Sequence, residues 1–250
     1  MVEGEVDELL ADAWPAVETE LVGRWRMRWS GGVTRRANSV LAVDGAGAIE
    51  ERIARVDAFY AAHNVPPRYL VSSAAAPPGL SALLSRRGYR SIAPTFVQCA
   101  PAATVVELTS VPAGLRVESA SSASDEWFSV FASTERYATG FGLRILRDVL
   151  LAPALPATFV SVRRAGHVVG VGQLVVEGTR ASVQCMTTRP DTRGGGVARG
   201  VLHRLACEGL AAGVSELWLA VMVDNEPARR LYARAGFTTS HEYSYYEPTA

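Results

Sequence analysis

A predicted strand runs into a predicted helix through the segment Thr187-Thr188-Arg189-Pro190-Asp191-Thr192-Arg193-Gly194-Gly195-Gly196-Val197-Ala198-Arg199. Three successive glycines allow the backbone to approach a ligand closely, because no side chain stands in the way. The first turn of the helix leaves its N–H groups without intrahelical partners, and such groups suit a phosphate. Arg193 and Arg199 add charge-assisted donors at the same place. The segment therefore predicts a phosphate-binding loop made of backbone and arginine.

Two other interpretations fit a glycine-rich loop. A plain strand-to-helix turn contains the same residue types, and glycine loops before helices are common. A Rossmann dinucleotide site needs the spacing G-x-G-x-x-G and an acidic residue about 20 residues further on. The segment has neither of these features, and the apolar strand 218–223 occupies the place of the acidic residue.

A second predicted helix follows that apolar strand, in the segment Asp224-Asn225-Glu226-Pro227-Ala228-Arg229-Arg230-Leu231-Tyr232-Ala233-Arg234-Ala235-Gly236-Phe237. Asn225 is a favourable N-cap, Pro227 suits the first turn, and Gly236 suits the end of the helix. Tyr232 lies about two turns beyond Asn225, so both side chains face one side of the helix.

Together the two segments resemble the GNAT superfamily of N-acetyltransferases. The family's loop pattern is R/Q-x-x-G-x-G/A, and residues 193–198 read RGGGVA. Its later pattern is N-x-x-A-x-x-L-Y-x-x-x-G-F, which is matched by Asn225, Ala228, Leu231, Tyr232, Gly236 and Phe237. The resemblance covers residues 114–250. It implies an α/β fold in which a mixed sheet is flanked by helices.

The resemblance also implies roles for particular residues towards acetyl-CoA. The strand before the loop splays from its neighbour in this family, and its backbone holds the pantetheine arm, here at Met186, Thr187 and Thr188. Backbone amides hold the pyrophosphate, here from Gly194 through Gly195, Gly196, Val197 and Ala198 to Arg199, with Arg193 beside them. Asn225 contacts the cofactor arm. Tyr232 protonates the leaving thiolate, since a phenol remains protonated at the pH where a thiolate forms.

The general base is left open by the sequence. Many relatives carry a glutamate on the strand before the loop, whereas the inward positions here are Ser182 and Gln184. Neither takes a proton from an ammonium group at neutral pH. The base is then a water held by Gln184, or a carboxylate such as Glu135 or Glu177, unless the amine arrives neutral. Gln184 serves catalysis, positions the substrate, or is a satisfied core residue.

Two halves are predicted, residues 1–108 and 114–250, joined by a linker at 109–113. Each half ends in the order helix, strand, helix with glycine and an aromatic residue, strand. This order suggests a tandem arrangement in which the first half is a degenerate GNAT copy; the alternative is an unrelated α/β subdomain. The loop at Ala46-Gly47-Ala48 lacks the phosphate pattern. The polar segment 34–39 is either a turn or part of the acceptor site.

Hydrophobic periodicity predicts the individual elements. After a first short helix, strands are expected at 24–30, 37–43, 69–72, 92–99, 104–108, 115–118, 158–163, 168–177, 181–188, 216–223 and 239–246. Helices are expected at 48–62, 79–87, 197–212 and 227–235, and two more lie between 127 and 150. The tyrosines of the last strand, Tyr243, Tyr245 and Tyr246, are candidates for the acceptor cleft.

Composition excludes several classes of protein. The 250 residues carry a formal net charge of +0, which gives no overall field for nucleic acid or an anionic membrane. All 25 residues of the Lys and Arg count are arginine, so phosphate-loop and Schiff-base lysines are excluded. Three dispersed cysteines have no metal-ligand or disulfide spacing, and no metal is expected. Without a membrane-spanning run or a signal sequence, the chain is expected to be cytoplasmic.

The predicted function is direct transfer of an acetyl group from acetyl-CoA to an acceptor amine, with no covalent enzyme intermediate. The alternative is a catalytically weak acyl-CoA sensor or scaffold. A protein amine, an antibiotic, a polyamine, an amino acid or another metabolite remains open as the acceptor. Acyl-chain preference and oligomeric state remain open too.

Overall fold

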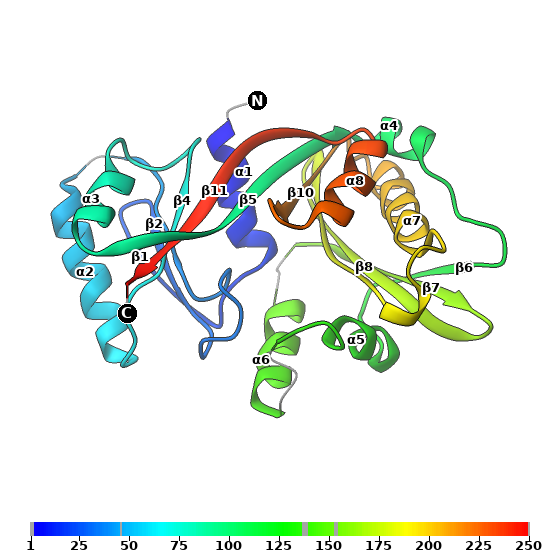
Figure 1. Cartoon of the computed structure of the whole chain (residues 1–250), viewed down its shortest axis with the longest axis horizontal. Coiled ribbons are helices and arrows are strands. Elements are labelled where there is room, and N and C mark those ends of the chain that lie inside the picture. Colours follow the sequence, from blue (N-terminus) through cyan, green and yellow to red (C-terminus); the bar gives the residue numbers. More distant parts are fainter. Residues whose placement is uncertain (1–2, 46, 137–139, 153–154, 250) are drawn as a thin grey trace.

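The protein, described by a computed structural model, is built on one mixed sheet of eleven strands with helices on both faces (Figure 1). The structure describes residues 3–45, 47–136, 140–152 and 155–249. Ala46 of the predicted loop therefore lies outside the described residues. The strands are β1 (Glu18–Val22), β2 (Trp25–Trp29), β3 (Val40–Leu41), β4 (Tyr69–Ser72), β5 (Tyr89–Pro101), β6 (Arg116–Ala120), β7 (Ala157–Arg164), β8 (His167–Glu177), β9 (Arg180–Thr188), β10 (Glu216–Met222) and β11 (Thr238–Pro248).

Eight α-helices lie in the described ranges, and each covers one part of the sheet. They are α1 (Glu3–Ala13), α2 (Ile49–Ala62), α3 (Leu80–Arg86), α4 (Ala102–Leu108), α5 (Asp125–Ala132), α6 (Gly140–Leu151), α7 (Val197–Ala211) and α8 (Glu226–Arg234). A short 3-10 turn, Pro190–Thr192, precedes α7. Helices α4 and α7 share one apolar core with β7 to β10, and α5 and α6 pack on the opposite face. Helices α2 and α3 cover the first half, and α1 packs across the middle. None of the described helices has the length and apolarity needed to cross a bilayer.

In the sheet, the last strand of each half lies beside strands of the other half. It runs β1-β2-β3-β4-β11-β5-β10-β9-β8-β7-β6. In the first half two antiparallel pairings precede the parallel pair β3/β4, and in the second half three precede the parallel pair β9/β10. The strand that ends each half then pairs with the other half, because β11 lies beside β4 and β5 lies beside β10. The two halves therefore end in the same order, three strands followed by helix, strand, helix and strand, and they complete each other's sheet.

Most predicted elements are confirmed, with one error and one omission. The strand predicted at 104–108 is wrong, because residues 102–108 form helix α4. Its β-branched run suggested a strand, but Ala102 and Val105 are the buried positions, and their spacing of three fits a helix packed against α7. The omitted strand is β1, which is an exposed edge strand with no inward apolar alternation.

A buried polar cluster ties α1 to the sheet. Asp7 is fully buried and its two carboxylate oxygens contact His241 Nε2 at 3.2 Å and Ser72 Oγ at 2.7 Å. His241 Nδ1 contacts Ser240 Oγ at 3.1 Å. Asp7 comes from α1, Ser72 from β4, and Ser240 and His241 from β11, so the cluster joins helix α1 to a strand of each half.

Replacing Asp7 by asparagine is expected to destabilise the fold by about 1–3 kcal/mol, because an amide in place of the carboxylate cannot accept at both oxygens. For a chain of this length the melting temperature then falls by about 2–12 °C. Asp12→Asn on the same helix is the matched control, since its carboxylate is partly exposed where it meets Arg26, and a change within about 1 kcal/mol is expected. Equal melting temperatures for the two variants would contradict the structural role of Asp7.

Candidate active site

Two neighbouring parallel strands separate in the middle of the sheet. Strands β9 and β10 are paired only from Arg180/Glu216 to Ser182/Trp218. Beyond that point β10 continues beside β5 as far as Met222, while β9 continues beside β8. From Val183 onward, the edge of β9 that faces β10 therefore has no strand partner. The predicted splay is present.

An irregularity in β9 accompanies the separation. Between Val171/Thr187 and Gln173/Gln184 the register with β8 shifts by one residue. Cys185 takes up the extra residue with a φ of +55°, a left-handed conformation unusual for a residue other than glycine. The bulge reorients the side chains of residues 184–186 relative to a regular strand.

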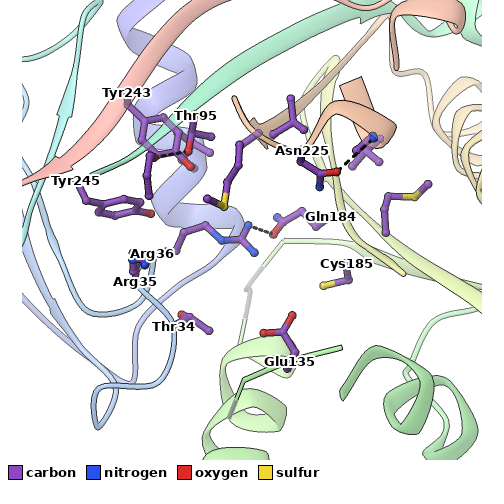
Figure 2. A pocket seen from close by; sticks show the side chains of 18 of the residues that line it. Thr34, Arg35, Arg36, Thr95, Glu135, Gln184, Cys185, Asn225, Tyr243 and Tyr245 are labelled. Carbon is purple, nitrogen blue, oxygen red and sulfur yellow. Dashed lines mark hydrogen bonds between the residues drawn. The ribbon is translucent and has the colours of Figure 1, made fainter. Parts of the chain in front are cut away.

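The separated strands open into a cavity of about 440 Å³ that both halves of the chain line. The second half contributes Val183 to Met186 of β9, parts of β10, and residues of α8. The first half contributes Leu10, Thr34, Arg35, Arg36, Ala93 and Thr95. Tyr243 and Tyr245 of β11 complete one wall, as predicted, whereas Tyr246 does not line it. Figure 2 shows arginines and tyrosines on one side and Glu135 and Cys185 on another.

Asn225 and Tyr232 reach this cavity together, as the helical spacing predicts. Asn225 is the N-cap of α8, because its Oδ1 accepts a hydrogen bond from Ala228 N at 3.3 Å. Tyr232 is buried and packs on Phe237 with ring centroids 5.8 Å apart. Burial raises the pKa of the Tyr232 phenol, so this group keeps its proton throughout the neutral range.

Gln184 is fully engaged within the protein. Its Nε2 donates to Ala13 O at 3.0 Å and to Ser182 Oγ at 2.9 Å. Its Oε1 accepts from an Arg36 guanidinium nitrogen at 3.2 Å (Figure 2). The side chain therefore joins α1 and the 34–36 segment to β9, and it holds Arg36 at the cavity wall.

The two carboxylates named as candidate bases differ in position. Glu135 lines the cavity, and burial raises the pKa of its carboxyl against the opposing effect of Arg36. Glu177 stands at the end of β8 and is not among the residues that line the cavity. Burial also raises its pKa, but its charged neighbours are Asp12 and Arg26. Of these two carboxylates, Glu135 is therefore the one that lines the cavity.

The glycine loop lies beyond the cavity, at the far end of β9. Gly194 and Gly196 have φ values of +80° and +73°, and a Cβ on Gly195 would come within 2.3 Å of the Arg164 guanidinium. Gly196 is the N-cap of α7 and supplies no side-chain cap, so the first N–H groups of Val197, Ala198 and Arg199 lack a side-chain partner.

Arg193 and Arg199 stand exposed at this loop. Within the described ranges neither forms a salt bridge, so both are available to an anion. Of the predicted site residues, the cavity therefore brings together Gln184, Met186, Asn225 and Tyr232. Thr187, Thr188 and the loop 193–199 form a second group, and β9 leads from one group to the other.

The corresponding loop of the first half has a different character. It joins β3 to α2, and the buried side chain of Arg52 donates to Gly45 O at 2.6 Å and to Gly47 O at 3.4 Å. The first turn of α2 carries Glu50 and Glu51. Arg52 already occupies the inside of this loop, and the two carboxylates at the helix N-terminus repel an anion. The loop therefore does not suit a phosphate.

The histidines lie elsewhere. His203 faces Thr109 Oγ1 at 3.1 Å, His167 is exposed at the start of β8, and His241 belongs to the Asp7 cluster. Cys185, Trp218 and Arg136 line the cavity without having been predicted, since no short motif marks them. In the described part of the chain, no group of three His, Cys, Asp or Glu side chains is arranged to hold a metal ion.

Comparison with known proteins agrees with this geometry. Residues 121–237 match the Acetyltransferase (GNAT) family, and this part of the chain is a GNAT acetyltransferase domain. The chain is similar to the uncharacterized N-acetyltransferase YobR of Bacillus subtilis, with 24% identity over 96% of both proteins.

Two solved structures share the fold over nearly the whole chain. A GCN5-related N-acetyltransferase from Kribbella flavida has a TM-score of 0.77 at 13% identity, covering 100% of this chain and 96% of that one. A tandem GNAT protein from the clavulanic acid biosynthesis pathway has a TM-score of 0.68 at 17% identity, covering 98% and 89%. The α/β fold with a mixed, helix-flanked sheet is thus confirmed.

Proposed function

We propose that the chain transfers an acetyl group from acetyl-CoA to an amine by direct attack within the shared cavity. The observation that carries the proposal is the separation of β9 from β10, which opens at Tyr232 and Asn225 and leads along β9 to the glycine loop. Acetyl-CoA supplies the acetyl group as an activated thioester. The amides of residues 194–199, with Arg193, are proposed to hold its pyrophosphate, and Met186 to Thr188 its arm.

The side chains suit a reaction without a covalent enzyme intermediate. Burial raises the pKa of the Cys185 thiol to about 12, so the cavity's cysteine is not a thiolate at neutral pH. Glu135 is proposed to accept the proton of the amine, and Tyr232 to donate a hydrogen bond to the leaving sulfur. N–H groups of β9 beyond Ser182, where its pairing with β10 ends, are proposed to stabilise the charge that develops on the carbonyl oxygen. Holding both reactants in one cavity supplies much of the rate.

The first half, residues 1–108, is proposed to be a degenerate GNAT copy joined at 109–113 to the catalytic half, 114–250. The repeated order of elements and the exchanged strands support this division. The Arg52-filled loop supports the loss of cofactor binding in that copy. Its contribution is then a wall of the acceptor site.

A thermal shift tests the cofactor site directly. Acetyl-CoA or CoA at about 100 times Kd is expected to stabilise the protein by about 2.7 kcal/mol. This corresponds to a rise in melting temperature of about 5–10 °C, with no rise for NAD or ATP. No shift with acetyl-CoA or CoA, in a protein that melts cooperatively, would refute the proposed site.

The variant Gly194→Asp is expected to remove that shift. Gly194 has open space around it, and aspartate tolerates a positive φ, so the variant adds a negative charge at the phosphate without a clash. The matched control is Gly178→Asp, at the turn between β8 and β9, where φ is +59° and the space is also open. Its shift with acetyl-CoA is expected to equal that of the wild type.

An acyl-CoA sensor or scaffold is the second candidate, because β9 carries Gln184 where many relatives have a glutamate, and Gln184 is already hydrogen-bonded within the protein. Tight acetyl-CoA binding with no CoA release over a broad amine panel would favour that function over catalysis.

A further inference from the structure

Residues 34–36 of the first half form a segment that carries two arginines and lines the cavity. The side chain of Asn38 holds it, accepting from Ser30 N and Gly32 N at 2.8 Å each and donating to the carbonyls of Val33 and Thr34. The Trp14 indole donates to Thr34 Oγ1 at 3.4 Å. These bonds fix the backbone before any ligand binds.

Arg36 extends from this segment into the cavity. Its guanidinium lies 4.3 Å from the centroid of the Trp14 ring and donates to Gln184 Oε1 at 3.2 Å. Neither contact supplies a negative charge, because a ring face and an amide oxygen carry no formal charge. Glu135, whose pKa is raised by burial and lowered in part by Arg36, acts on the guanidinium without forming a salt bridge with it. Arg36 is therefore a positioned guanidinium facing a binding space.

The cavity as a whole carries an excess of positive charge. Arg35, Arg36 and Arg136 line it, and Glu135 is the only carboxylate among the described residues that line it. Within the described ranges, none of the three arginines forms a salt bridge. This local excess stands in a chain whose formal net charge is +0.

The two kinds of charge occupy different parts of the cavity. Figure 2 shows Arg36 extending from the side of Tyr245 as far as Gln184, with Glu135 separate from it on the side of Cys185. A ligand with one anionic and one cationic group matches this arrangement, since guanidinium groups bind carboxylates in a forked geometry and a carboxylate suits an ammonium group. A volume of about 440 Å³ suits a small molecule.

We infer that the acceptor is a small amino carboxylic acid whose carboxylate is held by Arg36 and Arg35 while its amine faces Glu135. The inference rests on the proposed acetyl transfer and narrows its acceptor. Arg36 and Arg35 are thereby specificity-determining residues that the first half supplies to the chemistry of the second.

The test compares amino acids with their decarboxylated amines, such as phenylalanine with phenethylamine, tryptophan with tryptamine and leucine with isoamylamine. CoA release from acetyl-CoA is measured for each pair, together with the melting shift each compound produces in the CoA complex. A preference of about tenfold or more in kcat/KM for the carboxylated member is expected in at least one pair. The inference is overturned if the amines without a carboxylate react equally well or better, or if no carboxylated compound either reacts or shifts the melting temperature.

Variants of Arg36 and Arg35 test whether these side chains cause the preference for the carboxylated acceptor. Arg36→Gln is expected to lower kcat/KM for the amino acid by about tenfold or more relative to that for its decarboxylated partner, since any effect of Arg36 on Glu135 is common to both acceptors. Arg36→Lys is expected to restore part of this ratio. Arg35→Gln is a second variant that is expected to fold normally, because the Arg35 side chain has no hydrogen bond or ion pair with a described residue. Arg55→Gln, an exposed arginine paired with Glu20, is the control. An unchanged ratio in both cavity variants would overturn the assignment.

A separate measurement keeps this inference distinct from the proposed function. The acetyl-CoA melting shift is recorded for every variant and is expected to match the wild type. If acetyl-CoA itself produces no shift in the wild type, the proposed function fails. If acetyl-CoA binds and the decarboxylated amines are the better acceptors, only the inference about the carboxylate fails.

Discussion

Tyr232→Phe is expected to lower kcat by about 10²–10⁴-fold, because it removes the one phenol that α8 brings to the cavity beside Asn225. The buried hydroxyl keeps its proton in the neutral range, so it acts as a donor at the pH of the reaction. The ring remains to pack on Phe237, and the melting temperature is therefore expected to change little. Steady-state CoA release and a thermal melt measure the two effects.

The matched control for this prediction is Tyr246→Phe. Tyr246 lies on β11 but is not among the residues that line the cavity. Its kcat is expected to stay within about twofold of the wild type, well below the effect of losing a catalytic acid. A Tyr232→Phe variant that folds, binds acetyl-CoA and keeps its full kcat would remove Tyr232 as the acid.

Glu135→Gln is expected to lower kcat/KM by about 10²–10⁴-fold, since an amide cannot accept the proton of the amine. The pH dependence of kcat/KM is an independent test of the role of Glu135. Burial raises the pKa of Glu135, so its carboxyl takes up a proton at a higher pH than an ordinary glutamate, whose pKa is about 4.3. The wild-type kcat/KM should therefore decline, as pH falls, above the usual carboxylate range, and this step should vanish in the variant.

Glu177→Gln is the control, because burial raises that pKa in the same direction while the side chain stands outside the cavity. Near-wild-type activity and an unchanged acid limb are expected. If Glu177→Gln, rather than Glu135→Gln, removed the acid limb, the role of base would pass to Glu177.

Local patterns were sufficient to predict the second half. Three features depend only on spacing within one or two elements, and each is present. They are the glycine loop, the N-cap at Asn225, and the position of Asn225 and Tyr232 on the same cavity. Helix α4 was mispredicted because its β-branched residues outweighed the weak helical spacing of Ala102 and Val105. Strand β1 was missed because it is an exposed edge strand, so burial imposes no alternation on it.

The acceptor wall could not be predicted, because it depends on pairing between distant segments. Arg36 meets Gln184 only when β9, α1 and the 34–36 segment converge, and no local pattern encodes that meeting. The segment 34–39 was noted for its polarity, yet a surface turn has the same composition. The position of Glu135 was likewise open, since the sequence offered Glu177 as an equal candidate.

The exchange of β5 and β11 has a consequence for the order in which the chain acquires its structure during synthesis. Strand β11 comes last among the elements, yet it lies between β4 and β5 of the first half. The first half therefore emerges from the ribosome with the place between β4 and β5 empty, and both strands keep unpaired edges until residues 238–248 have been made. The native sheet of the first half can therefore be completed only after β11 has been made, and until then its unpaired strand edges are open to aggregation.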